Sequence, residues 1–168
     1  MREAIGNTFL FNVIIVFVVI FIIIFAGSSS YSKAAKVKNT IIDILVQNAD
    51  EIGPDSTRLP TTVTSKINAE LKNIGYRVNP NKTQTCRLRV DSEGTSTNGT
   101  SSSEAKRTAQ LLTPTSDYRY CVWRIPSERG YYFKVTSYMY FEFPLVSVIE
   151  YPIEGESRVI YDEVEHEY

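Results

Sequence analysis

Apolar residues dominate the beginning of the chain, and their spacing predicts one long helix. From Phe9 to Ala26 the only polar residue is Asn12. A helix of this length covers about 27 Å, which is close to the hydrocarbon core of a bilayer. From Ser28 to Asn48 there is no proline, and only Gly27 interrupts the junction. We therefore expect one helix of about 63 Å from Asn7 to Asn48, half of it in lipid and half outside.

The part of this helix outside the bilayer carries an apolar stripe. The stripe consists of Val37, Ile41, Ile44 and Leu45, which follow the i, i+4, i+7, i+8 spacing of one helix face. A solitary membrane tether has no need of such a face, whereas a helix that packs against other subunits does. We therefore interpret these four residues as an assembly face.

A second, shorter helix is predicted after a break at Gly53-Pro54. Pro60-Thr61-Thr62 is a helix entry, and Gly75 is a C-terminal stop. Between them, one face carries Val63, Ile67, Leu71 and Ile74.

After this helix the apolar residues alternate, which predicts strands with one buried side. Cys86, Leu88 and Val90 indicate a first strand, and the segment from Tyr118 to Ile125 indicates a second, with Cys121, Trp123 and Ile125 inward. Pro126 to Gly130 is a predicted turn. A long strand from Tyr131 to Phe143 follows, then Pro144, an irregular apolar stretch, and a possible edge strand at Arg158–Tyr161. The fold class is α+β: a long helix, then a small antiparallel sheet with one additional helix.

These patterns divide the chain into four parts. They are a membrane anchor (1–26), an amphipathic helical extension (27–52), an extracytoplasmic α+β domain (53–161) and an acidic tail (162–168). Within the domain, Asp91 to Ser103 has no apolar residue and reads as a flexible loop. Asn81-Lys82-Thr83 and Asn98-Gly99-Thr100 fit the N-glycosylation pattern, but such matches arise by chance in Ser- and Thr-rich segments.

The anchor, the orientation and the cysteines are linked questions. The apolar run is longer than a signal-peptide core, and Ala26-Gly27-Ser28 is only a fair cleavage site, so a retained anchor is favoured over a cleaved signal. Lys33, Lys36 and Lys38 after the run would place the domain in the cytoplasm by the positive-inside rule. Cys86 and Cys121 favour the opposite, because antiparallel neighbours could bridge them in an oxidising compartment. We expect a single-pass protein of the cell membrane with its N-terminus cytoplasmic and its C-terminal domain extracellular; two free thiols in a cytoplasmic domain is the alternative.

Composition and charge exclude several kinds of site. A net charge of −1, from 18 basic and 19 acidic residues, is too balanced for a nucleic-acid-binding surface. The two cysteines do not form a CxxC motif, and the single histidine, His166, lies in the acidic tail, so we expect no metal site. Without a histidine beside a nucleophile or a glycine-rich phosphate loop, we expect no catalysis, no cofactor and no small-molecule substrate.

One face of the long strand is rich in tyrosine. Thr136, Tyr138 and Tyr140 alternate there and predict an exposed aromatic ladder. Tyrosine is enriched at protein contacts because its apolar ring ends in a hydrogen-bonding hydroxyl. A contact surface and a face simply covered by a helix are equally compatible with the pattern.

With these elements in place, the chain resembles type IV pilin-like proteins, in particular the TadE-like pseudopilins of Gram-positive tight-adherence (Tad) pilus systems. The resemblance lies in Gly6 to Ile42 and in Val135 to Tyr161, where Phe143-Pro144-Leu145 is followed by Pro152 to Ser157. It implies that the helix packs against other pilin-like subunits or platform proteins in a pilus or secretion platform, with the sheet domain facing outward. The fifth residue after Gly6 is Phe11, where many pilins have glutamate, so the resemblance implies an uncleaved or accessory component.

A stand-alone membrane-tethered binding or adhesion domain is the rival interpretation. In that case the tyrosine face or the Ser/Thr loop would contact a surface ligand, and membrane lipid would be the only partner of the helix. The stripe at Val37–Leu45 is the feature that favours assembly over this alternative.

Overall fold

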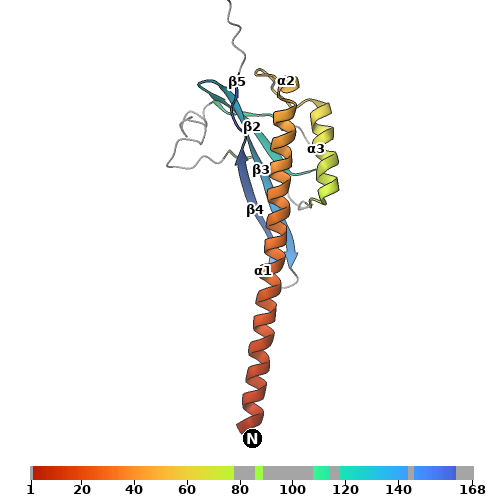
Figure 1. The fold of residues 1–168 in the computed structure, drawn as a ribbon. Helices are drawn as coiled ribbons and strands as arrows, with labels where there is room; N and C mark the ends of the chain where they lie inside the picture. Colours follow the sequence, from red (N-terminus) through yellow and green to blue (C-terminus); the bar gives the residue numbers. More distant parts are fainter. Residues whose placement is uncertain (1, 78–85, 89–107, 114–117, 144–145, 162–168) are drawn as a thin grey trace, which may run out of the picture.

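The fold is a long helix packed on a small antiparallel sheet (Figure 1). The computed structural model describes residues 2–77, 86–88, 108–113, 118–143 and 146–161. Helix α1 spans Arg2–Gln47 without a break and passes through Gly27. The predicted rod is therefore confirmed, and the α+β fold class with it.

A short helix and a loop connect α1 to the second long helix of the domain. Helix α2 (Ala49–Ile52) ends at Gly53, which has a positive φ of 66°. Helix α3 (Thr61–Ile74) ends at Gly75 in the left-handed conformation, with φ 71°. The N–H of Gly75 donates to the carbonyls of Leu71 and Lys72, as a glycine at this position of a helix end does. The predicted helix entry and stop are both confirmed.

The sheet is antiparallel throughout. Its strands are β1 (Gln110–Leu111), β2 (Tyr120–Ser127), β3 (Gly130–Phe143), β4 (Val146–Glu156) and β5 (Ile160–Tyr161). They lie in the order β1-β2-β3-β4, and β5 pairs with the beginning of β3. In the register, Val122 is opposite Val135, and Thr136 is opposite Glu154. Strand β3 is therefore the centre of the sheet.

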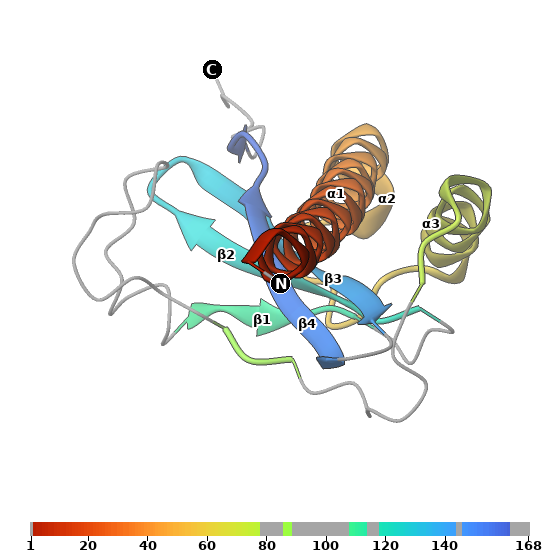
Figure 2. The same ribbon diagram turned by 90° about the horizontal axis from the view of Figure 1, so that it is seen from below.

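The core lies between the outer half of α1, helix α3 and one face of the sheet. Figure 2, which looks along α1, shows this helix against the sheet with α3 beside it. The sheet contributes Tyr120, Val122, Phe133 and Val135, and α3 contributes Val63, Ile67 and Leu71; all are buried. The apolar face predicted for α3 is therefore the face that packs.

Three details of the sheet differ from the sequence prediction. The stretch after Pro144 is not irregular: β4 pairs with β3 along most of its length. Its Pro152 hid the strand in the sequence, but a proline is tolerated at the edge of a sheet because no ladder hydrogen bond is needed on the open side. Pro126 and Ser127 belong to β2, so the turn before β3 is shorter than expected.

The third difference concerns the predicted strand at Cys86–Val90. Residues 86–88 belong to no strand, and Val90 lies outside the described residues. Leu88 packs instead against Ile125 and Tyr132, which form a second small cluster on the face of the sheet opposite α1. The segment therefore covers a face of the sheet instead of extending its edge, and β2 is buried on both sides. Asp91–Ser103, both glycosylation motifs and the acidic tail lie outside the described residues.

Candidate functional site

The apolar stripe of α1 faces the chain's own domain. Val37, Ile41 and Leu45 are 0% exposed and belong to the main core, and Ile44 is half-buried against it. The interpretation of these residues as a face for another subunit is therefore corrected. The spacing was right, but a helix stripe needs an apolar partner surface, and here the sheet and α3 supply it.

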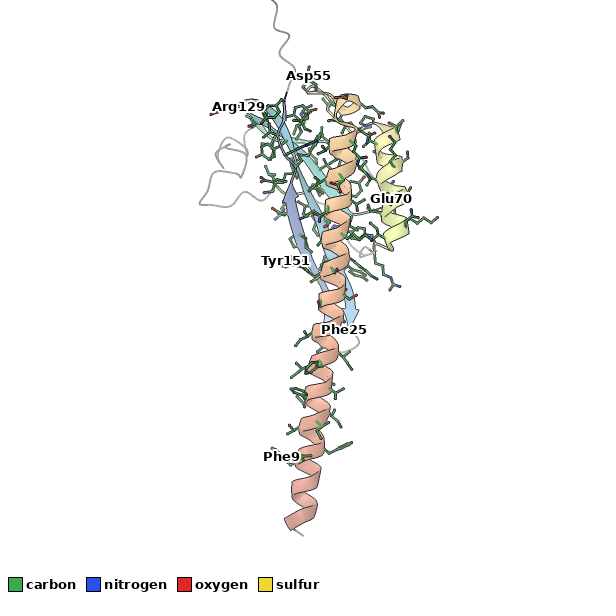
Figure 3. All side chains as sticks on the ribbon, in the orientation of Figure 1. Phe9, Phe25, Asp55, Glu70, Arg129 and Tyr151 are labelled. Atoms are coloured by element: carbon green, nitrogen blue, oxygen red, sulfur yellow. A yellow bond between two sulfur atoms is a disulfide. The ribbon has the colours of Figure 1, made fainter. Side chains whose placement is uncertain are left out.

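The N-terminal half of α1 is the part that stands clear of the domain. Most of its large apolar side chains between Phe9 and Phe25 are exposed, with exposed fractions from 46% at Ile15 to 78% at Phe25 (Figure 3). By length and composition, α1 contains one candidate membrane span in the described chain. This exposed half is consistent with a membrane anchor or a signal sequence, and it is the surface of α1 open to lipid or to another helix.

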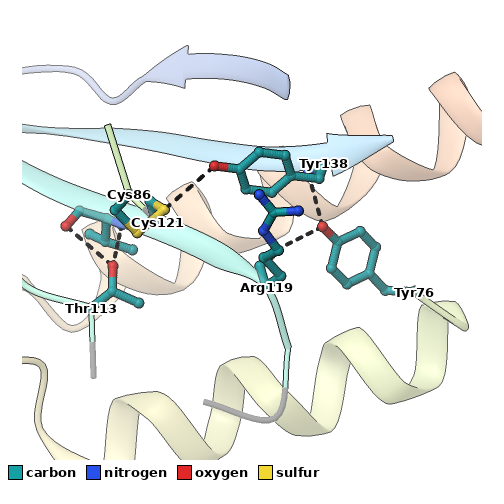
Figure 4. The surroundings of a disulfide bond; sticks show 7 residues. Tyr76, Cys86, Thr113, Arg119, Cys121 and Tyr138 are labelled. Atoms are coloured by element: carbon teal, nitrogen blue, oxygen red, sulfur yellow. Dashed lines mark hydrogen bonds between the residues drawn. A yellow bond between two sulfur atoms is a disulfide. The ribbon is translucent and has the colours of Figure 1, made fainter. Parts of the chain in front are cut away.

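The predicted disulfide is present. Cys86 and Cys121 are bonded, with 5.7 Å between their Cα atoms (Figure 4). Cys121 lies on β2 and points to the face opposite α1, where the segment at 86–88 crosses. The bond therefore attaches a non-strand segment to the back of the sheet, whereas the sequence suggested two paired strands. A disulfide is a sign of an oxidising compartment and so of an extracytoplasmic domain.

The tyrosine face is not an exposed ladder. Thr136 is 4% exposed, and Tyr138 and Tyr140 are half-buried. The guanidinium of Arg119 lies 4.1 Å from the centre of the Tyr138 ring, and the Tyr138 hydroxyl lies 3.8 Å from the Cys121 sulfur. Among the described residues no helix covers this face, so neither of the two sequence-based interpretations describes it. Charged side chains and the disulfide segment cover it instead.

Ion pairs on the same face involve all three long strands. Arg119, next to β2, pairs with Glu150 of β4, and both side chains are largely buried. Lys134 of β3 lies 3.2 Å from Glu154 and 3.8 Å from Glu156. The Lys134 pairs join the neighbouring strands β3 and β4 and support their register. The Arg119–Glu150 pair reaches across β3, from the residue before β2 to β4.

Tyr76 forms a bridge that the sequence did not predict. Its hydroxyl accepts a hydrogen bond from the backbone N–H of Tyr138 at 2.9 Å and donates one to the carbonyl of Arg119 at 2.8 Å (Figure 4). The β2–β3 pairing ends next to it, at Tyr120 and Ser137. Burial raises the pKa of Tyr76 well above its ordinary value. The hydroxyl therefore stays protonated and takes the place of a backbone hydrogen bond at the end of the ladder. The sequence carries no pattern that predicts this role for Tyr76, which simply follows the helix-stopping glycine Gly75.

A cavity of about 370 Å³ lies beyond this bridge. It is bounded by α1, by the end of α3 and by β3 where β2 no longer covers its edge. Its lining comprises Ser30, Lys33, Ala34, Gly75, Tyr76, Arg77, Tyr138 and Tyr140. Two of these residues are cationic and none carries a carboxylate. Two of the three residues of the predicted contact surface thus line a cavity, while Thr136 does not.

No cluster of metal-ligating side chains occurs in the described part of the chain. His166 lies outside it.

Comparisons with family models, with curated proteins and with solved structures find no match to this chain. The architecture can still be classified from its elements. A long, apolar N-terminal helix is followed by a small antiparallel sheet on which the outer half of that helix packs, with one extra helix beside it. The chain therefore has a type IV pilin-like α+β layout, and its membership of a particular family is not shown by any of the three comparisons.

Proposed function

We propose that this chain is a non-catalytic pilin-like (pseudopilin) subunit, anchored by one membrane span and assembled through its N-terminal helix into a pilus or secretion platform. One observation carries the proposal: α1 is continuous, but only its outer half is buried in the chain's own domain. The inner half projects as a bare apolar rod. In proteins with the pilin layout, such a rod contacts lipid and neighbouring rods.

Two further features support a retained span and an outward domain. The helix runs through Ala26, Gly27 and Ser28 without interruption, so the exposed half and the half packed on the domain belong to one continuous helix. The Cys86–Cys121 disulfide fits an oxidising compartment. A membrane-impermeant thiol reagent tests the orientation in intact cells. Labelling that appears only after reduction supports an extracellular domain, and labelling that requires cell lysis contradicts it.

Within the span, Asn12 is the residue on which assembly can be tested. Its amide is exposed on the isolated chain, and in lipid an amide without a hydrogen-bond partner is costly. A hydrogen bond to a neighbouring span satisfies it and contributes about 1–2 kcal/mol in peptide systems. We expect Asn12→Leu to weaken subunit association by about 5- to 30-fold. Förster transfer between labelled full-length chains in lipid vesicles measures this, with Val16→Leu as the control.

The alternative is a stand-alone membrane-tethered binding domain. The stripe Val37–Leu45 no longer speaks against this alternative, because the chain's own sheet and α3 cover it. A cysteine scan along the exposed span residues between Phe9 and Phe25 separates the two functions. Crosslinks confined to one helix face, in native membranes, support assembly. Weak crosslinks of equal strength at every position, matching those of a surface control such as Lys72→Cys, support the solitary tether.

A further inference from the structure

The base of the domain lies at the level where the apolar run of α1 ends. Ser137 of β3 donates a hydrogen bond to the carbonyl of Ala34 at 2.9 Å. From there β3 continues to Phe143, about 20 Å further toward the N-terminal end of α1. Figure 3 shows the end of β3 beside α1, close to Phe25. With the span in a membrane, as proposed above, this end of the domain touches the bilayer surface.

The cavity lies at the same level. Ser30 and Lys33 are about 6 Å and about 10 Å beyond Ala26 along the helix axis. The headgroup layer on each side of a bilayer is about 5–8 Å thick. A lysine or arginine at its outer boundary reaches into it with a long, flexible side chain. The opening between α1 and β3 is therefore next to lipid headgroups.

The chemistry of the lining selects an anion. Lys33 lies on α1 and Arg77 lies in the segment that follows α3, and both are exposed residues of the cavity lining. Ser30 of α1 adds a hydroxyl-bearing side chain, and no lining residue is acidic. The Tyr138 hydroxyl points away, toward the Cys121 sulfur. Ammonium and guanidinium groups that converge without a carboxylate suit a phosphate, to which they make charge-assisted hydrogen bonds. The volume, about 370 Å³, is in the range of small-ligand pockets.

We propose that this cavity binds the phosphate of an anionic phospholipid headgroup and so fixes the domain on the membrane surface beside its own span. The inference rests on the proposed membrane anchoring, because it is the bilayer that brings a headgroup to this level. The ligand we propose is a lipid and not free phosphate, because the cavity borders the apolar span on one side.

The test uses the full-length chain in neutral detergent micelles, with retained lipid counted by native mass spectrometry. Phosphatidylglycerol and phosphatidylcholine are the two lipid probes, and inorganic phosphate is the competitor. The site variant is Lys33→Gln/Arg77→Gln. The matched control is Lys36→Gln/Lys72→Gln, which removes the same charge from exposed positions of α1 and α3 outside the cavity lining. Both pairs are exposed, so both variants keep the core intact.

We expect one phosphatidylglycerol retained in preference to phosphatidylcholine. The site variant should bind it at least about tenfold more weakly, and the control should stay within about twofold of the original chain. Equal losses in the two variants would reduce the effect to general surface charge and overturn the proposal. Displacement by millimolar inorganic phosphate, or equal retention of both lipids, would also overturn it.

Flotation with pure phosphatidylcholine vesicles separates this inference from the anchor itself. A chain that fails to float contradicts membrane anchoring. A chain that floats but binds the two lipids equally contradicts only the headgroup site.

Discussion

Replacing Ile41 by alanine tests directly whether the stripe of α1 belongs to the chain's own core. Ile41 is 0% exposed and packs within the main cluster between α1, α3 and the sheet. The change removes three methyl or methylene groups, worth about 2.4 kcal/mol in transfer free energy. The unfilled space adds a cavity cost, so the free energy of unfolding should fall by about 3–4 kcal/mol.

The assay is urea unfolding of the full-length chain in micelles, followed by the fluorescence of Trp123, the single tryptophan. This side chain packs at the opposite face of the sheet, so its signal reports global unfolding. Asn39→Ala is the control, because Asn39 is exposed on the same helix and its substitution should change stability by less than about 0.5 kcal/mol.

Crosslinking within the span completes the experiment. If Ile41 is a core residue, the folded fraction of the variant should crosslink through its span like the original chain. A loss of crosslinking with a stability change below about 1 kcal/mol would refute the reasoning, because it would mean that Ile41 contacts another subunit.

Three further predictions concern the domain. Replacing Cys86 and Cys121 by alanine opens a loop with a sequence separation of 35. By the chain-entropy relation this should lower the free energy of unfolding by about 4 kcal/mol. Reduction of the original chain should lower it by the same amount in urea unfolding, and a loss below about 1 kcal/mol would contradict this. Tyr76→Phe should cost about 1–3 kcal/mol, because a buried backbone donor loses its acceptor. The raised pKa of Tyr76 also means that the unfolded chain loses this proton first, so stability should fall as the pH rises above about 10; that part of the pH dependence should be absent from Tyr76→Phe, and identical alkaline profiles would disprove the link. Gly130→Ala should lower the melting temperature far more than Gly75→Ala. A Cβ at Gly130 would lie 2.0 Å from a backbone oxygen of β5, whereas a Cβ at Gly75 meets open space and carries only the cost of the positive φ, about 1–2 kcal/mol. Equal melting temperatures of the two variants would show that β5 is not held against β3.

The sequence alone determined the elements that depend on local pattern. A continuous apolar run can satisfy its backbone in lipid only as a helix, so α1 followed directly. In the same local way, the glycine after Ile74 marked the end of α3, and the alternation from Tyr131 to Phe143 marked β3. Two cysteines at compatible positions were enough to predict the disulfide, and it is present.

The tertiary structure alone decided what each face contacts. A helical stripe at Val37–Leu45 specifies that something apolar must cover it, but another subunit and the chain's own sheet satisfy that demand equally. Strand β4 was invisible because an edge strand that contains Pro152 has no clear alternation, and only its pairing with β3 defines it. The bridge of Tyr76 and the cavity with Lys33 and Arg77 join α1, α3 and β3 across long stretches of sequence. Such sites depend on how three elements pack together, and no local pattern encodes that arrangement.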